Sequence, residues 1–296
     1  MAEIGSIILT EAVGLAKKLK AVALLAYWEQ IGAFEAVTEA AREMDLVLVL
    51  RGEVGRSRAE KLTDKVVLVP KAMLTRKAQI TLGVLAATSQ TLFRPGDLVV
   101  CLAGPCGRAE VDAIQVTRIR ETGPAVTPEY AGPSEGSISA HVFNGVLNLA
   151  VELAQEGREG RPIGTIFVLG DQDRVLQFSR QAVLNPFAGY PEDELSVLDQ
   201  VMKETVREFS SLDGAFIIRG DGVLLAAGRH IQAGSADLEL PQGMGARHHA
   251  AAGITAVTGA VAMAISESSG SVTVFHKGKI IASLEKATPG LLVSES

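Results

Sequence analysis

The chain has 296 residues, of which 47% are hydrophobic and 21% charged, enough for two domains with well-packed cores. The formal net charge of −6 provides no broad basic surface, which argues against DNA or RNA as a partner. The longest uncharged stretch, 250–265, is shorter than the ~20 residues that a membrane helix needs, and the N-terminus has no secretory pattern. We therefore expect a soluble, cytoplasmic protein that binds neither nucleic acid nor a membrane.

The first part of the chain alternates apolar runs with helical patterns. Runs typical of buried strands occupy 21–27, 46–50, 66–69 and 98–102, and apolar positions with helical spacing occupy 32–42 and 75–91. Strands that alternate with helices are typical of a parallel sheet. The sequence therefore predicts a small α/β domain over residues 1–121, with a largely parallel sheet.

A linker and a second domain follow. Residues 122–140 are rich in proline, glycine and serine, a composition that resists both helix and sheet. Beyond this predicted linker, helical periodicity recurs at 143–154 and 198–209, a polar turn is expected at 171–173, and strands are expected at 164–170, 215–218, 223–227, 260–265 and in a hairpin over 272–282. We predict a second α/β domain over 141–296, with a mixed central sheet flanked by helices.

Asp213 lies between the second periodic helix and the strand that starts at Ala215, with Gly214 beside it. A carboxylate at such a junction can hold a metal and orient a hydroxyl, while the glycine lets a ligand approach the backbone. A structural Asp-Gly turn is the alternative. Taken alone, these residues leave both interpretations open.

A glycine-rich segment, Gly-Met-Gly-Ala-Arg-His-His at 243–249, leads into a helix expected to begin near Arg247. The free backbone N–H groups and the positive dipole end of a helix start favour phosphate binding. Arg247 can pair with phosphate oxygens in bidentate fashion. His248 and His249 can donate hydrogen bonds or bind a metal, although adjacent histidines are also common on surfaces.

Ser266 and Glu267 follow a strand of small residues. Open α/β sheets bind ligands outside the carboxyl ends of their strands, so both side chains are candidates for a binding site. An ordinary polar turn is the alternative.

Five motifs in order resemble the diadenylate cyclase domain over about residues 141–285: RPIGTIFVLG at 161–170, LNPFAGY at 184–190, LDGAFII at 212–218, GARHHAAA at 245–252 and SESSG at 266–270. Two further stretches, FRPGDLVVCLAGP at 93–105 and IQVTRI at 114–119, resemble the C-terminal domain of pyruvate kinase. This combination is similar to the archaeal branch of the diadenylate cyclase family.

The resemblance implies a nucleotidyltransferase that condenses two ATP molecules into the second messenger cyclic di-AMP and two pyrophosphates, with Mn²⁺ or Mg²⁺. It implies catalytic roles for Asp213 and Glu267 and a metal held by Asp213 and His248. It also implies ATP-binding roles for nine residues: Gly214, Ala215, Leu225, Gly245, Ala246, Arg247, His248, His249 and Ser266. Because each site handles one ATP and the product joins two, the resemblance further implies a homo-oligomer whose cyclase domains face each other.

Two positions depart from the family pattern. Ala246 and His249 stand where the family usually has threonine and arginine. Three interpretations stay open: weaker triphosphate binding, pH-dependent binding through His249, or normal variation within the archaeal branch. The alternative function is therefore a catalytically weak, nucleotide-binding regulatory protein. Retention of Asp213, Arg247, His248 and Glu267 favours the enzyme.

Overall fold

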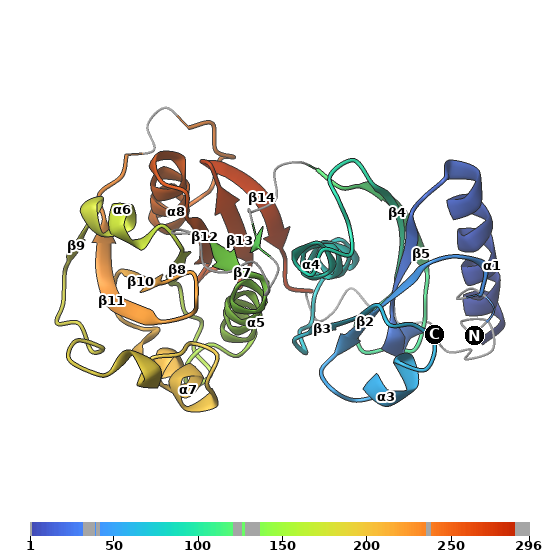
Figure 1. Cartoon of the computed structure of the whole chain (residues 1–296), viewed down its shortest axis with the longest axis horizontal. Coiled ribbons are helices and arrows are strands. Elements are labelled where there is room, and N and C mark those ends of the chain that lie inside the picture. The colour runs from blue at the N-terminus through green and yellow to red at the C-terminus, as the bar shows by residue number, and fades with distance from the viewer. Residues whose placement is uncertain are drawn as a thin grey trace. The chain divides into compact units, whose positions relative to one another are not determined.

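The computed structural model describes residues 2–31, 39, 42–120, 126–127, 137–234 and 238–287. The chain forms two compact units (Figure 1). The first comprises Met1–Thr88, Leu92–Arg120 and Leu284–Ser296, and the second comprises Ser89–Thr91 and Glu121–Ser283. No helix within the described ranges is long and apolar enough to cross a membrane.

The sheet of the first unit has the order β3-β2-β1-β4-β5. Its strands are β1 (Ala23–Tyr27), β2 (Leu46–Arg51), β3 (Val66–Val69), β4 (Leu98–Ala103) and β5 (Ala113–Arg118). The first four are mutually parallel and β5 is antiparallel to β4, which confirms the predicted, largely parallel sheet. The predicted helix at 32–42 lies almost entirely outside the described residues.

Helices cover both faces of this sheet (Figure 1). These are α1 (Ala2–Leu19) and α4 (Arg76–Ser89), with the single-turn η1 (Trp28–Gln30) and α3 (Arg56–Ala59) in loops. One face packs Leu24 and Leu48 against Val13 of α1. On the other face, Gly83 of α4 lies against Val49 and would place a Cβ atom 3.1 Å from it. The alternating sides of each buried strand therefore meet different helices.

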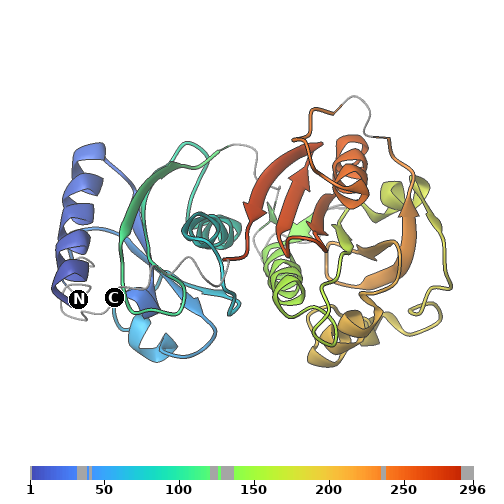
Figure 2. The same cartoon turned by 180° about the vertical axis from the view of Figure 1, so that it is seen from behind.

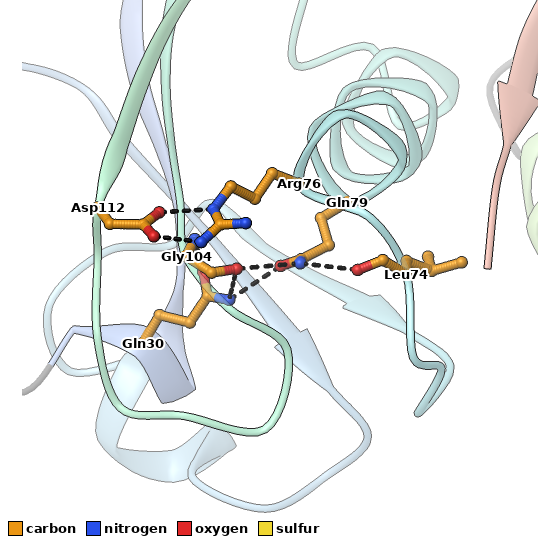
Figure 3. Close-up of polar contacts among 6 residues, drawn as sticks. All are labelled: Gln30, Leu74, Arg76, Gln79, Gly104 and Asp112. Atoms are coloured by element: carbon orange, nitrogen blue, oxygen red, sulfur yellow. Dashed lines mark hydrogen bonds and ion pairs between the residues drawn. The ribbon is translucent and has the colours of Figure 1, made fainter. Parts of the chain in front are cut away.

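A buried polar network ties the strand ends of the first unit together (Figure 3). Gln30 and Gln79 are each 1% exposed. The Gln30 amide donates to Gln79 Oε1 at 2.9 Å and to the Gly104 carbonyl at 3.0 Å, and the Gln79 amide donates to the Leu74 carbonyl at 3.1 Å. Because buried amides are costly when unpaired, these bonds hold the ends of β1 and β4 to the start of α4.

Residues from the far end of the chain complete this unit. Lys286 forms an antiparallel bridge with Leu74. The Thr75 amide donates to the Glu285 carbonyl at 3.1 Å, and the Ala287 amide donates to the Met73 carbonyl at 2.8 Å. The first unit is therefore discontinuous in sequence.

The sheet of the second unit has the order β14-β13-β12-β8-β10-β11-β9. Its strands are β8 (Ile166–Leu169), β9 (Ser179–Gln181), β10 (Ala215–Ile218), β11 (Leu224–Ile231), β12 (Val261–Ile265), β13 (Val272–His276) and β14 (Lys279–Leu284). β8 is parallel to β10, whereas β12 is antiparallel to β8 and β11 to β10. The predicted mixed sheet is thus confirmed.

Helices α5 (Ala140–Glu156) and α8 (Ala246–Val257) lie on opposite faces of this sheet (Figures 1 and 2). The remaining helices are α6 (Gln172–Gln177), the single-turn η2 (Glu192–Glu194) and α7 (Gln200–Phe209). Ala251 and Ile254 of α8 share a core with Ile166 and Val168 of β8. Phe167 points to the other face. The alternation along β8 therefore fixes which side chains meet α8.

Three local predictions differ from the structure. The polar turn expected at 171–173 begins α6 instead, after Asp171 in a left-handed conformation. Val201, expected on a packed helix face, is 79% exposed, because α7 buries little more than Val206. Within the predicted linker, β6 (Val126–Thr127) pairs with β7 (Ile138–Ser139), since β-branched residues there favour extended pairing; residues 121–125 and 128–136 lie outside the described ranges.

Candidate functional site

Three chain segments meet at one edge of the second sheet. Ile166 of β8 is opposite Ala215 of the parallel β10 and opposite Ala264 of the antiparallel β12. The segments before β8, before β10 and after β12 therefore emerge side by side. This register brings Asp213 to the same edge as the Ser266 turn.

The candidate site lies at the amino ends of β8 and β10 and at the carboxyl end of β12, which Ser266 and Glu267 follow as expected. The rule for open α/β sheets applies to parallel strands, and β12 runs against β8, so only β12 ends there. The opposite edge is filled by the protein itself. The Asp171 carboxylate accepts a hydrogen bond from the Gly259 amide at 2.6 Å, and a Cβ atom on Gly220 would lie 1.9 Å from the Ser137 carbonyl.

Helix α8 brings Arg247 to this edge. Arg247, Ala251 and Ile254 are spaced at i, i+4 and i+7, so they share one helix face. Ala251 and Ile254 are fully buried, and Arg247 extends the same stripe to the rim. There its Nη1 atom lies 3.3 Å from Glu267 Oε2. The structure thus brings together Arg247 and Glu267, both predicted site residues.

The start of α8 has the features of an anion seat. The helix begins at Ala246, with Gly245 as its N-cap, within one residue of the expected start. A Cβ atom on Gly245 would meet nothing within 4 Å. Its carbonyl accepts from the amides of His248 and His249 at 3.0 and 3.2 Å, whereas the described residues supply no acceptor for the amides of Ala246 and Arg247. Such unpaired N–H groups suit phosphate oxygens.

His248 lies inside the protein rather than at its surface. It is 8% exposed, and its ring meets Phe275 edge-on with centroids 6.2 Å apart. Burial, with a smaller contribution from the charge of His249, lowers the pKa of His248 below its usual value. His248 therefore packs as a neutral imidazole, while His249 is exposed.

Asp213 and Gly214 have different surroundings. Asp213 is exposed, and within the described ranges its carboxylate joins no hydrogen bond or ion pair, so its oxygens can take an external ligand. Gly214 has φ +116°, and a Cβ atom there would lie 2.6 Å from the Gly228 carbonyl carbon. What approaches the backbone of Gly214 is β11, so its first requirement is strand packing rather than ligand access.

The remaining predicted site residues differ in burial and in their contacts. Ala215 is fully buried, and Leu225 is partly buried against the core under α8. Ser266 places its hydroxyl 3.3 Å from that of Ser268. Among the described residues, no group of three or more His, Cys, Asp or Glu side chains is gathered as a metal site.

Sequence reasoning assigned no role to Asn185 or Gly164. The side-chain amide of Asn185 donates to the Leu225 carbonyl at 2.9 Å, and the Oδ1 atom of Asn185 accepts from the Ala227 amide at 3.3 Å. Asn185 therefore holds its own loop against β11. A Cβ atom on Gly164 would lie 2.5 Å from Arg247 Nη1. Both residues fall inside the motifs that carry the family resemblance, which was the available signal.

Comparisons with known proteins agree with this geometry. Residues 152–280 match the family described as DisA bacterial checkpoint controller nucleotide-binding, and residues 6–122 match a probable sensor domain, DacZ_P. A diadenylate cyclase of Methanocaldococcus jannaschii is 36% identical over 68% of this chain and 64% of its own length. A diadenylate cyclase of Haloferax volcanii is 32% identical over 71% of this chain and 76% of its own.

Among solved structures, a double mutant of DacA from Staphylococcus aureus aligns with 50% of this chain and 87% of its own, at 22% identity and a TM-score of 0.35. The two matched segments define a chain with a cyclase-family domain over residues 152–280 and a separate N-terminal domain over residues 6–122. The chain belongs to the diadenylate cyclase family. It spans just under two thirds of the Methanocaldococcus relative and about three quarters of the Haloferax one.

Proposed function

We propose that this protein condenses two ATP molecules into cyclic di-AMP and two pyrophosphates. The observation that carries the proposal is the convergence at one sheet edge of a free carboxylate, Asp213, with the Arg247 and Glu267 pair. In-line phosphoryl transfer depends mainly on positioning the nucleophile and neutralising charge. An acceptor for a hydroxyl proton and a cationic phosphate seat are the groups that this reaction needs.

In the proposed reaction, the ribose 3′-oxygen of one ATP forms a bond to the α-phosphorus of the other. The bond between that phosphorus and the bridging oxygen breaks, and pyrophosphate leaves with the electron pair. Asp213 orients the attacking hydroxyl and receives its proton. Arg247 and the free amides at the start of α8 hold the phosphates and the leaving charge. Repetition in the opposite direction closes the ring.

Asp213 is the residue that fits a divalent cation. Mg²⁺ and Mn²⁺ prefer carboxylate, phosphate and water oxygens, and the carboxylate of Asp213 is exposed. A bound ion would neutralise phosphate charge and lower the pKa of the hydroxyl. With no group of three ligands among the described residues, we propose that the ion arrives with ATP. His248, also a candidate ligand, is buried against Phe275, which favours a packing role.

We propose that two copies of the chain face each other to complete catalysis. Asp213 is exposed at the rim, and the described residues of each copy offer one proposed phosphate seat, at the start of α8. The second ATP must then be presented by a partner. Ser266, Ala215 and Leu225 remain proposed parts of the nucleotide pocket.

We also propose that residues 1–121 form a separate domain that regulates the cyclase. The match to a probable sensor domain over residues 6–122 supports this assignment. ATP as substrate, the absence of a spanning helix in the described residues and the net charge of −6 support a cytoplasmic protein that does not bind nucleic acid.

The decisive experiment is incubation of the purified full chain with ATP and either Mn²⁺ or Mg²⁺, followed by chromatography and mass identification. We expect cyclic di-AMP and pyrophosphate. Binding of ATP with no product under any metal condition would instead establish the alternative, a nucleotide-binding regulatory protein. Ala246 and His249, which replace a hydroxyl and a permanent cation of the family pattern, are the observation that favours this alternative.

A further inference from the structure

Gly164 lies directly against the ion pair of Arg247 and Glu267. It immediately precedes Thr165 and β8 (Ile166–Leu169). A Cβ atom on Gly164 would lie 2.5 Å from Arg247 Nη1, 2.9 Å from Arg247 Cζ and 3.1 Å from Glu267 Cβ. Two of these distances are shorter than real carbon contacts allow. The guanidinium therefore occupies the space that any side chain at this position would need.

Strand alternation explains why Gly164 faces Arg247. Side chains two apart on a strand share a face, and Ile166 and Val168 both contact the core under α8. Gly164 continues that row by one step toward the rim. Arg247 likewise continues the Ala251 row of α8 outward. Both rows end at the same point, where Gly164, two residues before β8, meets the longest side chain of α8.

The role of this glycine is not backbone conformation. Glycines that serve a left-handed turn have positive φ, as Gly214 does at +116°. Gly164 is not among the positive-φ glycines. Gly164 is buried, so what this position requires is space, and the Arg247 guanidinium occupies that space.

The ion pair itself contributes little to stability. The side chains of Arg247 and Glu267 are 39% and 60% exposed, and the stability contributed by solvent-exposed pairs of this kind is small. The consequence of the ion pair is geometric, because it holds the guanidinium across Gly164. A phosphate can exchange for the carboxylate at small cost.

We infer that Gly164 is a positioning residue for nucleotide binding, which acts by leaving room for Arg247 to lie across the sheet edge beside Glu267. The inference rests on the proposed function, since it concerns the same phosphate seat. A side chain at position 164 would lift the guanidinium away from Glu267 and from the start of α8. The triphosphate of ATP is the ligand whose affinity then falls.

The test is a double-mutant cycle on the full chain, read as affinity for the unreactive analogue α,β-methylene ATP by calorimetry. We expect Gly164→Ala to weaken binding about tenfold, comparable to loss of a charge-assisted hydrogen bond. In an Arg247→Ala background the same change should alter affinity by less than about twofold, because coupled positions are not additive. Equal losses in both backgrounds would overturn the inference, as would unchanged affinity in Gly164→Ala.

Thermal unfolding keeps the test decisive if Gly164→Ala folds poorly. Removal of the guanidinium in Arg247→Ala should relieve the clash and raise the Tm of the double variant above that of Gly164→Ala. A double variant no more stable than the single one would show that Gly164 serves backbone packing, and the inference would be wrong.

Gly234→Ala is the matched control, because a Cβ atom there meets nothing within 4 Å, and it should bind like the wild type. The two claims fail separately. A wild-type chain that makes no cyclic di-AMP removes the cyclase proposal, but the analogue still reports whether Gly164 acts through Arg247.

Discussion

Gly214 and Gly228 face each other across β10 and β11, and a Cβ atom on Gly214 would lie 2.6 Å from the Gly228 carbonyl carbon. Both glycines have positive φ, at +116° and +67°. At Gly214, the residue after Asp213, the backbone lies so close to that of Gly228 that only glycine fits. The position of the proposed catalytic carboxylate depends on this packing.

We predict that Gly214→Ala lowers the free energy of unfolding by about 2 kcal/mol or more, because both the clash and the backbone conformation are unfavourable. Urea unfolding followed by circular dichroism measures the loss. Gly234→Ala is the control, since a Cβ atom there would meet nothing within 4 Å, and it should unfold like the wild type. Equal stability of Gly214→Ala and the wild type would contradict the packing.

Asp213→Asn should reduce the rate of cyclic di-AMP formation by roughly 100-fold or more, since positioned acid–base groups contribute factors of this size. The Tm should not fall, because the exposed carboxylate has no partner among the described residues. Product formation is measured by chromatography. Asp173→Asn is the control, because Asp173 is an exposed residue of α6. A similar loss of activity in both variants would show that Asp213 has no specific catalytic role.

Mixed assemblies test the facing arrangement. A wild-type subunit paired with an Asp213→Asn subunit should perform the first transfer and fail at the second, because each Asp213 orients the hydroxyl of its own ATP. A linear dinucleotide should therefore accumulate as excess variant is added to the wild type. If cyclic di-AMP alone forms, in proportion to the wild-type fraction, then each chain closes the ring without its partner.

Chelation tests how the metal is held. Because Asp213 is the one carboxylate assigned to the ion, EDTA should abolish product formation and leave the Tm within about 2 °C, unlike structural metal sites that couple to folding. Differential scanning fluorimetry and the product assay are read on the same samples. A large fall in Tm with EDTA would show that the protein binds the ion without ATP, which would contradict the proposal that the ion arrives with ATP.

Acidification should destabilise the protein in part through His248. Its folded pKa is lowered by burial, so as pH falls below about 6.5 the unfolded chain takes up a proton before the folded one, and stability is lost. His248→Leu removes this proton and keeps an apolar contact with Phe275. The difference in Tm between pH 7.5 and pH 5.5 should shrink in this variant. His276, whose pKa is also lowered by burial, accounts for a residual difference.

The sequence predicted most elements of the fold because their patterns are strong. β10 matches its predicted range of 215–218, and the start of α8 falls within one residue. The exceptions have local causes. Asp171 adopts a left-handed conformation and starts α6, which a polar turn composition does not distinguish. Val201 follows helical spacing but faces solvent, since periodicity shows which residues share a face and not whether anything covers it.

The site was harder to predict because it depends on strand direction. Ser266 follows the carboxyl end of its strand as expected, but β12 runs against β8, so the same edge holds the amino ends of β8 and β10, and no motif encodes that reversal. The placement of Gly164 under Arg247 likewise requires the register of α8 on the sheet. Gly164 and Ser266 both lie in recognisable motifs. The sequence therefore indicates which segments form the site, but not how they are arranged.

The pairing of 285–287 with 73–75 has a consequence for synthesis of the chain. A ribosome makes Leu74 and the rest of the first sheet long before Lys286 emerges. At about 5–20 residues per second, the first unit waits roughly ten to thirty seconds for its last pairing partner, while the whole cyclase sheet is produced in between. The pairing of 285–287 with 73–75 can form only after the second unit has been translated, so the first unit is completed last.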